Sequence, residues 1–239
     1  TLKPSQMFSG AALGGIDWKV NMGVAVLGMV LILAAVAVLA FLLLPMAVGV
    51  GARGESPWRL LYFVAVGLGY ILVEIAFIQR FVLFLGHPTY ALTVVVFLML
   101  LSSGAGSIMS RKWFLQAERV RLPLLATIVG CAIYLLLLPS LLTTLVGLPF
   151  AAKLLVSGLL LAPLGFAMGM PFPAGLRALA GAGEETAEWA WAMNAASSVL
   201  GSVMAMVIAI QFGLAVTLAC GAAAYLAAAG MARRLWAAN

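Results

Sequence analysis

One ionisable side chain, Glu74, lies near the middle of a long apolar segment of the sequence. A charged side chain at the centre of a membrane helix costs about 2.5–3.5 kcal/mol on insertion scales, so its presence needs a reason. In a helix, Tyr70 lies four residues earlier on the same face, and its hydroxyl can meet the Glu74 carboxyl. Two interpretations stay open: a polar cavity or proton path around Glu74, and a contact between helices that fixes their packing.

Two further polar side chains, Gln79 and Arg80, follow in the same apolar segment. Six residues correspond to about 240° around a helix, so Arg80 and Glu74 lie on different faces. We expect Arg80 to extend along the helix towards Gly86, where the apolar segment ends, or to pair with a neighbouring helix.

A stripe of small and polar residues starts at Asn194 in a later apolar segment. The spacing i, i+3, i+4, i+7 and i+8 places on one helix face Asn194, Ser197, Ser198, Gly201 and Ser202. Small residues four apart allow close helix contact, while the Asn194 amide needs a hydrogen-bond partner in hydrocarbon. Both close packing and the lining of a cavity fit this stripe. The candidate intramembrane polar site comprises the polar side chains of these two segments, Tyr70, Glu74, Gln79, Arg80 and Asn194.

His87 is the single histidine, and it precedes Pro88 between two apolar segments. A histidine here can sense protons, or it can cap the end of the preceding helix at the membrane interface. One histidine excludes a bis-histidine haem and any metal site that needs two histidines. The chain also contains no P-loop, HExxH or GxSxG motif, so we assign no catalytic residue, no metal and no cofactor to it.

The overall composition requires a lipid environment. Of 239 residues, 65% are hydrophobic and 8% are charged, against about 25% charged in soluble domains. So few charges exclude a soluble enzyme, a disordered chain and a nucleic-acid-binding domain. The net charge of +6 then records orientation in the membrane and not affinity for nucleic acid. We predict an all-α integral membrane protein whose first partner is the lipid bilayer.

Seven apolar segments approach or exceed the roughly 20 residues that a membrane-spanning helix needs. They are Gly23–Val50, Trp58–Leu85, Tyr90–Ser110, Leu122–Leu148, Ala152–Met170, Trp189–Gln211 and Phe212–Trp236. The connectors are short, and Pro171 and Pro173 end the fifth span before a short interfacial helix, Ala174–Ala180. We therefore divide the chain into a linker from an absent upstream domain, residues 1–19, and a helical membrane domain, residues 20–239.

The basic residues predict an orientation for these spans. With seven spans, four basic residues lie on the side of the N-terminus and nine on the other side, which includes residues 111–121. The positive-inside rule then places the C-terminus in the cytoplasm and Thr1 outside.

Four motifs occur in a fixed order along the apolar segments. They are Gly67–Tyr90 around Glu74, Gly104–Ser107, the break Met168–Pro173, and Trp189–Gly201 with Asn194. Together they resemble the membrane part of bacterial spermidine-synthase-like proteins, over most of residues 58–212. In that family, membrane helices are fused to a Rossmann-like domain of the polyamine aminopropyltransferase type. The resemblance implies a multi-pass protein of the bacterial inner membrane.

The resemblance also implies a function for the chain, as a module that anchors or serves an upstream Rossmann-like domain. That domain would belong to the same polypeptide or to a partner subunit, and Leu2–Gln6 resembles the exit from it. The chain lacks a nucleotide-binding Gly-rich loop and the acidic residues of aminopropyl transfer, so any transferase activity lies outside these 239 residues. A cofactor domain in the cytoplasm conflicts with Thr1 outside, which leaves open an error of one span or an extracytoplasmic domain.

Two other functions stay open from the sequence. One is a transporter-like protein with a polar cavity around Glu74, and the other is a structural subunit of a larger membrane complex.

Overall fold

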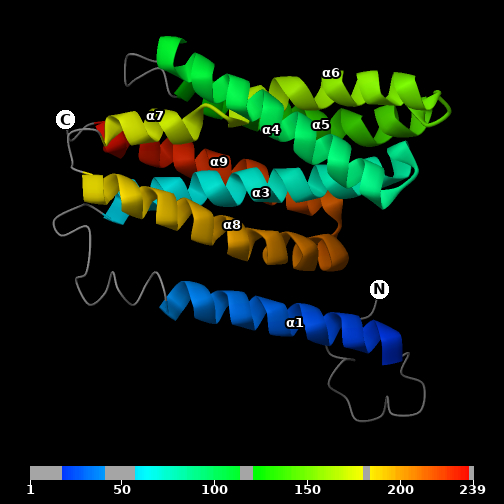
Figure 1. Ribbon diagram of the computed structural model, residues 1–239, viewed down its shortest axis with the longest axis horizontal. Coiled ribbons are helices and arrows are strands. Elements are labelled where there is room, and N and C mark those ends of the chain that lie inside the picture. The colour runs from blue at the N-terminus through cyan, green and yellow to red at the C-terminus, as the bar shows by residue number, and fades with distance from the viewer. Residues whose placement is uncertain (1–17, 41–56, 114–120, 180–183, 237–239) are drawn as a thin grey trace.

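The computed structural model describes residues 18–40, 57–113, 121–179 and 184–236, and helices make up nearly all of these ranges (Figure 1). The helices are α1 (Trp18–Val38), α3 (Pro57–Leu85), α4 (Pro88–Trp113), α5 (Arg121–Leu145), α6 (Phe150–Met168), α7 (Pro171–Ala178), α8 (Glu184–Phe212) and α9 (Leu214–Trp236). Within the described ranges there is no β-strand, so the predicted all-α class is confirmed there.

Six segments among the described residues are long and apolar enough to cross a membrane. They are Arg59–Leu85, Pro88–Trp113, Arg121–Leu145, Phe150–Ala178, Glu185–Phe212 and Leu214–Ala232. The expected first span, Gly23–Val50, coincides in part with α1, whose apolar stretch Ala25–Val38 is shorter. Residues 41–50 and most of the expected linker, residues 1–17, lie outside the described residues. The seventh span and the linker therefore stay predictions.

Large apolar side chains point outwards from the helix bundle as well as inwards. Leu83 is 82% exposed, and Leu136 and Leu159 are each 75% exposed. Apolar side chains exposed around a whole bundle match a lipid environment, because there they contact hydrocarbon chains and not water. The chain is thus a multi-pass membrane protein in contact with the bilayer.

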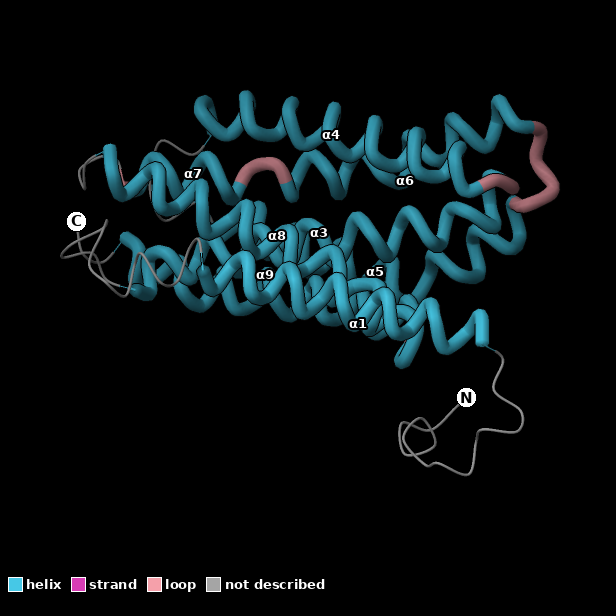
Figure 2. The backbone as a smooth tube through the Cα atoms, turned by 60° about the horizontal axis from the view of Figure 1, so that its bottom comes forward, coloured by secondary structure: helices cyan, strands magenta, loops and turns pink. Residues whose placement is uncertain are grey.

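Helix α3 lies at the centre of the bundle, with α8 and α9 packed along it and α4 beside it (Figures 1 and 2). In its most apolar window, 61% of the residues are buried, against 17–33% in the other spans. Its fully buried side chains include Tyr62, Phe63, Phe77 and Phe81. Because α3 carries Glu74, its central position leaves only 8% of this residue exposed.

The predicted proline break separates α6 from α7 (Figure 2). Pro171 and Pro173 occupy the first turn of α7, where a missing N–H costs no helical hydrogen bond. The expected short helix, Ala174–Ala180, is present as Pro171–Ala178. At the break, Gly169 packs so closely on the backbone of Ser103 in α4 that a Cβ there would overlap it. The break therefore lies directly against α4.

The helices turn at one end of the bundle through residues 86–87, 146–149 and 213. Gly86 and Gly213 have φ angles of +83° and +90°, a conformation that glycine adopts without the steric cost of a Cβ. Arg80 and Lys153 lie towards this end, whereas Arg59, Arg111, Lys112, Arg121 and Arg177 lie towards the other. The described basic residues thus divide between the two ends as the sequence predicted.

Candidate functional site

Glu74 lies inside the bundle, and 8% of its surface is exposed. It is one turn beyond Tyr70 and two turns beyond Gly67 on α3, so these three residues form one stripe. Within the described ranges, no hydrogen bond or ion pair holds the Glu74 carboxyl. An ionised carboxylate in such a place is costly unless it is paired, so the position calls for a proton or a cation.

Tyr70 connects this stripe to α4. Its hydroxyl donates a hydrogen bond to Ser103 Oγ at 3.3 Å, and not to the Glu74 carboxyl four residues along. Ser103 Oγ in turn donates to the carbonyl of Leu100, at 3.1 Å. The contact that the sequence suggested within α3 is therefore made between α3 and α4. The physical reason is direction, because a long helical side chain leans towards the N-terminus of its helix, so the Tyr70 hydroxyl points away from residue 74.

Asn194 lies on the opposite flank of the stripe, in α8. A Cβ at Gly67 would lie 2.6 Å from the carbonyl oxygen of Asn194 and 2.7 Å from its side-chain oxygen. Ser198 Oγ is 3.4 Å from the Gly67 carbonyl, and both Ser197 and Ser198 donate to the Asn194 carbonyl. The small-residue stripe thus packs α8 closely against α3 and places the Asn194 amide beside Gly67. Close packing, one of the two uses expected of this stripe, is observed at Gly67, and the lining of a cavity by Asn194 stays a prediction.

Tyr225 of α9 is a polar residue that the sequence patterns did not single out. Its side chain is fully buried, and its hydroxyl has no hydrogen-bond partner in the described part of the chain. A Cβ at Gly69 would lie 2.9 Å from the Tyr225 ring, so the missing side chain on α3 makes room for it. The sequence feature that could have identified this residue is a tyrosine within a helix of mostly small and apolar residues.

Gln79 and Arg80 do not join Glu74. Gln79 Nε2 donates to the sulfur of Met206 in α8 at 2.8 Å. Arg80 extends to a cavity beside α5 and α9, and no ion pair between Arg80 and Glu74 occurs. Both side chains leave α3 far from the Glu74 stripe, as their spacing of five and six residues requires. The five predicted site residues therefore do not form one cluster. Tyr70 and Glu74 lie on one face of α3, and Asn194 of α8 packs on the same face at Gly67.

His87 is exposed in the turn between α3 and α4. Its Nδ1 accepts a hydrogen bond from the backbone N–H of Thr89 at 3.2 Å, and its ring lies 5.6 Å from that of Tyr90. It therefore caps the start of α4, and not the end of the preceding helix. In the described residues, no group of three His, Cys, Asp or Glu side chains could hold a metal ion.

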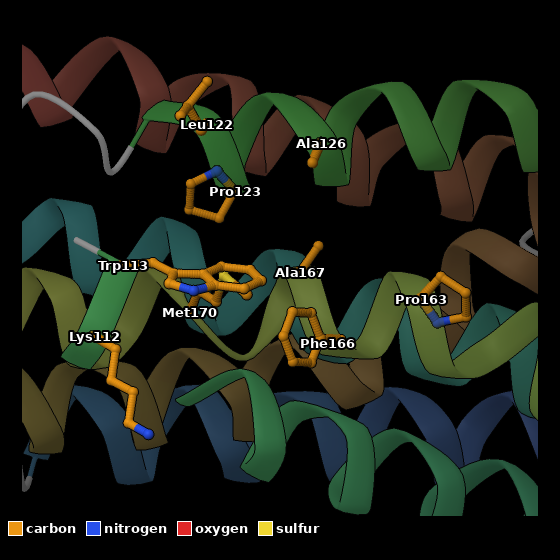
Figure 3. Close-up of a pocket in the computed structure, with 9 residues that line it drawn as sticks. All are labelled: Lys112, Trp113, Leu122, Pro123, Ala126, Pro163, Phe166, Ala167 and Met170. Carbon is orange, nitrogen blue, oxygen red and sulfur yellow. The ribbon is translucent and has the colours of Figure 1, made fainter. Parts of the chain in front are cut away.

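A separate cavity of about 670 Å³ opens between α5 on one side and the ends of α4 and α6 on the other (Figure 3). Leu122, Pro123 and Ala126 of α5 face Trp113 and Phe166 across it, while Lys112 points away. Its lining is apolar, and it contains none of the candidate polar residues. The cavity therefore suits a hydrocarbon chain of the bilayer more than a polar ligand.

Comparison of the chain with family models, with curated proteins and with solved structures found no match. The resemblance to spermidine-synthase-like membrane proteins thus continues to depend on the four ordered motifs alone.

Proposed function

We propose that this chain is the membrane module of a spermidine-synthase-like protein, in which Glu74 binds an amine cation inside the helix bundle and so serves an upstream Rossmann-like domain. The observation that carries the proposal is the buried Glu74 carboxyl, which has no ion-pair or hydrogen-bond partner among the described residues. The four ordered motifs support the family, and the chain itself contributes no catalytic residue or cofactor. An amine fits Glu74 because it supplies both the positive charge and the hydrogen-bond donors that the carboxylate lacks.

The surroundings of Glu74 support a small polar ligand. The Asn194 side-chain oxygen lies against Gly67, on the same helix as Glu74 and two turns before it. The Tyr225 ring packs on Gly69 of that helix, with its hydroxyl buried without a partner in the described residues. Buried polar groups without partners cost about 1–3 kcal/mol each, so such groups accumulate where a ligand or water completes their bonding. An ammonium group donates three hydrogen bonds and can satisfy acceptors from more than one helix.

Equilibrium binding of radiolabelled spermidine to the chain in lipid nanodiscs tests the proposal. The variant Glu74→Gln keeps the shape of the side chain and removes its charge. We expect it to bind at least about tenfold more weakly, because hydrogen bonds to charged groups contribute about 1.5–3 kcal/mol. Glu188→Gln is the matched control, since Glu188 is an exposed carboxylate of α8. Equal binding by the wild-type chain and Glu74→Gln would show that Glu74 serves helix packing.

A transporter is the second candidate function, and the break between α6 and α7 favours it. Transporters build substrate sites at broken helices, where backbone groups become free near the membrane midplane. Here Gly169 at the break packs on Ser103, whose hydroxyl is bonded to Tyr70 of the Glu74 stripe. Uptake of labelled spermidine into proteoliposomes, lost in Glu74→Gln, would support transport. Binding without uptake would support the membrane module. The absence of both binding and uptake would favour a structural subunit.

The proposal includes a location in the bacterial inner membrane with the C-terminus in the cytoplasm. The excess of basic residues at the end of the bundle that carries Arg111, Lys112 and Arg121 supports this orientation. A reporter enzyme that is active only in the cytoplasm, fused after Asn239, tests it. Activity supports the orientation, and a silent fusion that is nevertheless produced at full length contradicts it.

A further inference from the structure

A second cavity, of about 280 Å³, lies at the end of the bundle where α8 turns into α9. It is distinct from the Glu74 site and from the cavity in Figure 3. Its lining includes Arg80 and Phe84 of α3, Leu142, Thr143 and Val146 from the end of α5 and the turn after it, and Leu214 of α9. All of these residues lie within the described ranges. The cavity thus combines apolar walls with one permanently charged group.

The Arg80 guanidinium brings unmet hydrogen-bonding capacity to this cavity. Its Nε atom is buried and has no hydrogen-bond partner in the described part of the chain. Arginine cannot lose its proton in a protein, so burial does not neutralise the charge. Arg80 is a half-buried cation whose Nε has no partner among the described residues, so it can bind an anion from outside the chain.

A second cation lies over an aromatic ring that lines the cavity. Lys153 Nζ of α6 is 5.6 Å from the centroid of the Phe84 ring, and Phe84 also lines the cavity with Arg80. No aspartate or glutamate occurs in the described residues of the turns at this end, 86–87, 146–149 and 213, or within two turns of helix from them. The local charge is therefore positive, and no acidic residue of these described turns and helix ends compensates it.

The position of the cavity selects the source of the anion. Arg80 is five residues before the end of α3 at Leu85, about 7.5 Å along the helix axis, within reach of the headgroup region for an extended side chain. Leu83 is 82% exposed and Val146 is 48% exposed, so the apolar wall continues onto the surface that faces lipid. A ligand with an anionic phosphate and a hydrocarbon chain meets both requirements at once.

We propose that this cavity binds an anionic phospholipid of the bilayer. Its phosphate lies against the Arg80 guanidinium, with Lys153 as the second cation, and one acyl chain follows the apolar wall at Leu142 and Val146. Arginine suits this role because its planar fork of donors matches phosphate oxygens. The zwitterionic lipid phosphatidylcholine binds less well, since its own ammonium group offsets the attraction of two cations.

Native mass spectrometry of the full chain with phosphatidylglycerol, phosphatidylcholine or inorganic phosphate tests the proposal. We expect the wild-type chain to retain phosphatidylglycerol in preference to phosphatidylcholine, and inorganic phosphate to leave the lipid in place. Arg80→Gln is expected to lower phosphatidylglycerol retention by about tenfold to a hundredfold, the range for a hydrogen-bonded charge. Arg80→Lys loses less, and Arg111→Gln at the opposite end of the bundle loses nothing.

A cavity-filling variant covers the case in which Arg80→Gln fails to fold. Val146→Trp places a bulky ring in the cavity from its exposed side and keeps Arg80, so it should also release phosphatidylglycerol. The proposal is overturned if Arg80→Gln and Val146→Trp retain the lipid as the wild-type chain does. It is also overturned if both lipids bind equally, or if inorganic phosphate displaces the phospholipid and thus occupies the site alone.

Discussion

Gly67 lies at a close approach between α3 and α8, and its replacement by alanine tests whether this contact positions the Glu74 stripe. A Cβ at Gly67 would lie 2.5 Å from Ser197 Oγ, 2.6 Å from the Asn194 carbonyl oxygen and 2.7 Å from the Asn194 side-chain oxygen. Side-chain movement of Ser197 relieves one of these contacts. The contact with the Asn194 backbone remains, so α8 must move away from α3.

Two opposing effects set the size of the change. Overpacking of a tight interface costs about 1–3 kcal/mol. Alanine in place of glycine also favours the helix itself by up to about 1 kcal/mol. Gly104→Ala isolates the second effect, because a Cβ at Gly104 of α4 meets no atom within 4 Å. The difference in unfolding free energy between the two variants is therefore about 1–3 kcal/mol, with Gly67→Ala the less stable.

Unfolding in mixed micelles with increasing sodium dodecyl sulfate, followed by circular dichroism, measures this difference. The same two variants are then compared in spermidine binding, where Gly67→Ala is expected to bind more weakly and Gly104→Ala to match the wild-type chain. Equal stability of the two variants would refute the packing of α8 on α3 at Gly67. Lower stability with unchanged spermidine binding would refute the link between this contact and the Glu74 site.

Two further predictions address the polar bond within the bundle and its lipid-facing surface. Tyr70→Phe removes the hydrogen bond to Ser103. We expect it to lower the unfolding free energy by about 0.6 kcal/mol, the average for such bonds in membranes. A change above about 2 kcal/mol in the same micelle titration would contradict a single bond of this kind. Leu159→Arg places a charge at a position of α6 where the leucine side chain is 75% exposed. The insertion cost of about 2.5–3.5 kcal/mol is expected to lower the yield of inserted protein, measured by carbonate extraction. A normal yield would show that this face of α6 does not contact lipid.

The sequence was sufficient to predict the helices because hydrophobicity over about 20 residues is a local property. The span expected at Trp58–Leu85 is observed at Pro57–Leu85, and the prolines after Met170 end α6 where expected. Helix ends shifted by a few residues where polar residues can still continue a helix, as at the start of α8, Glu184. Such polar turns extend beyond the hydrocarbon, where hydropathy no longer reports them.

The partners of each helix face could not be predicted from one sequence. The spacing placed Tyr70 and Glu74 on one face, but the choice between the Glu74 carboxyl and Ser103 as the partner of Tyr70 depends on where α4 lies. The burial of Tyr225 could not be predicted because it depends on Gly69, which lies more than 150 residues earlier and makes room for its ring. The cavity beside Arg80 likewise could not be predicted, because α5 and α9 form its other walls.

Protection of Glu74 from a hydrophobic carbodiimide is the most direct test of an amine bound at this carboxyl. The reagent dicyclohexylcarbodiimide enters the bilayer and modifies carboxyl groups there, and peptide mass spectrometry locates the modified residue. We predict that Glu74 is modified in the chain in nanodiscs and that saturating spermidine slows this modification at least about tenfold, while the exposed Glu188 shows no protection. Modification of Glu74 at the same rate with and without spermidine would contradict the proposed site.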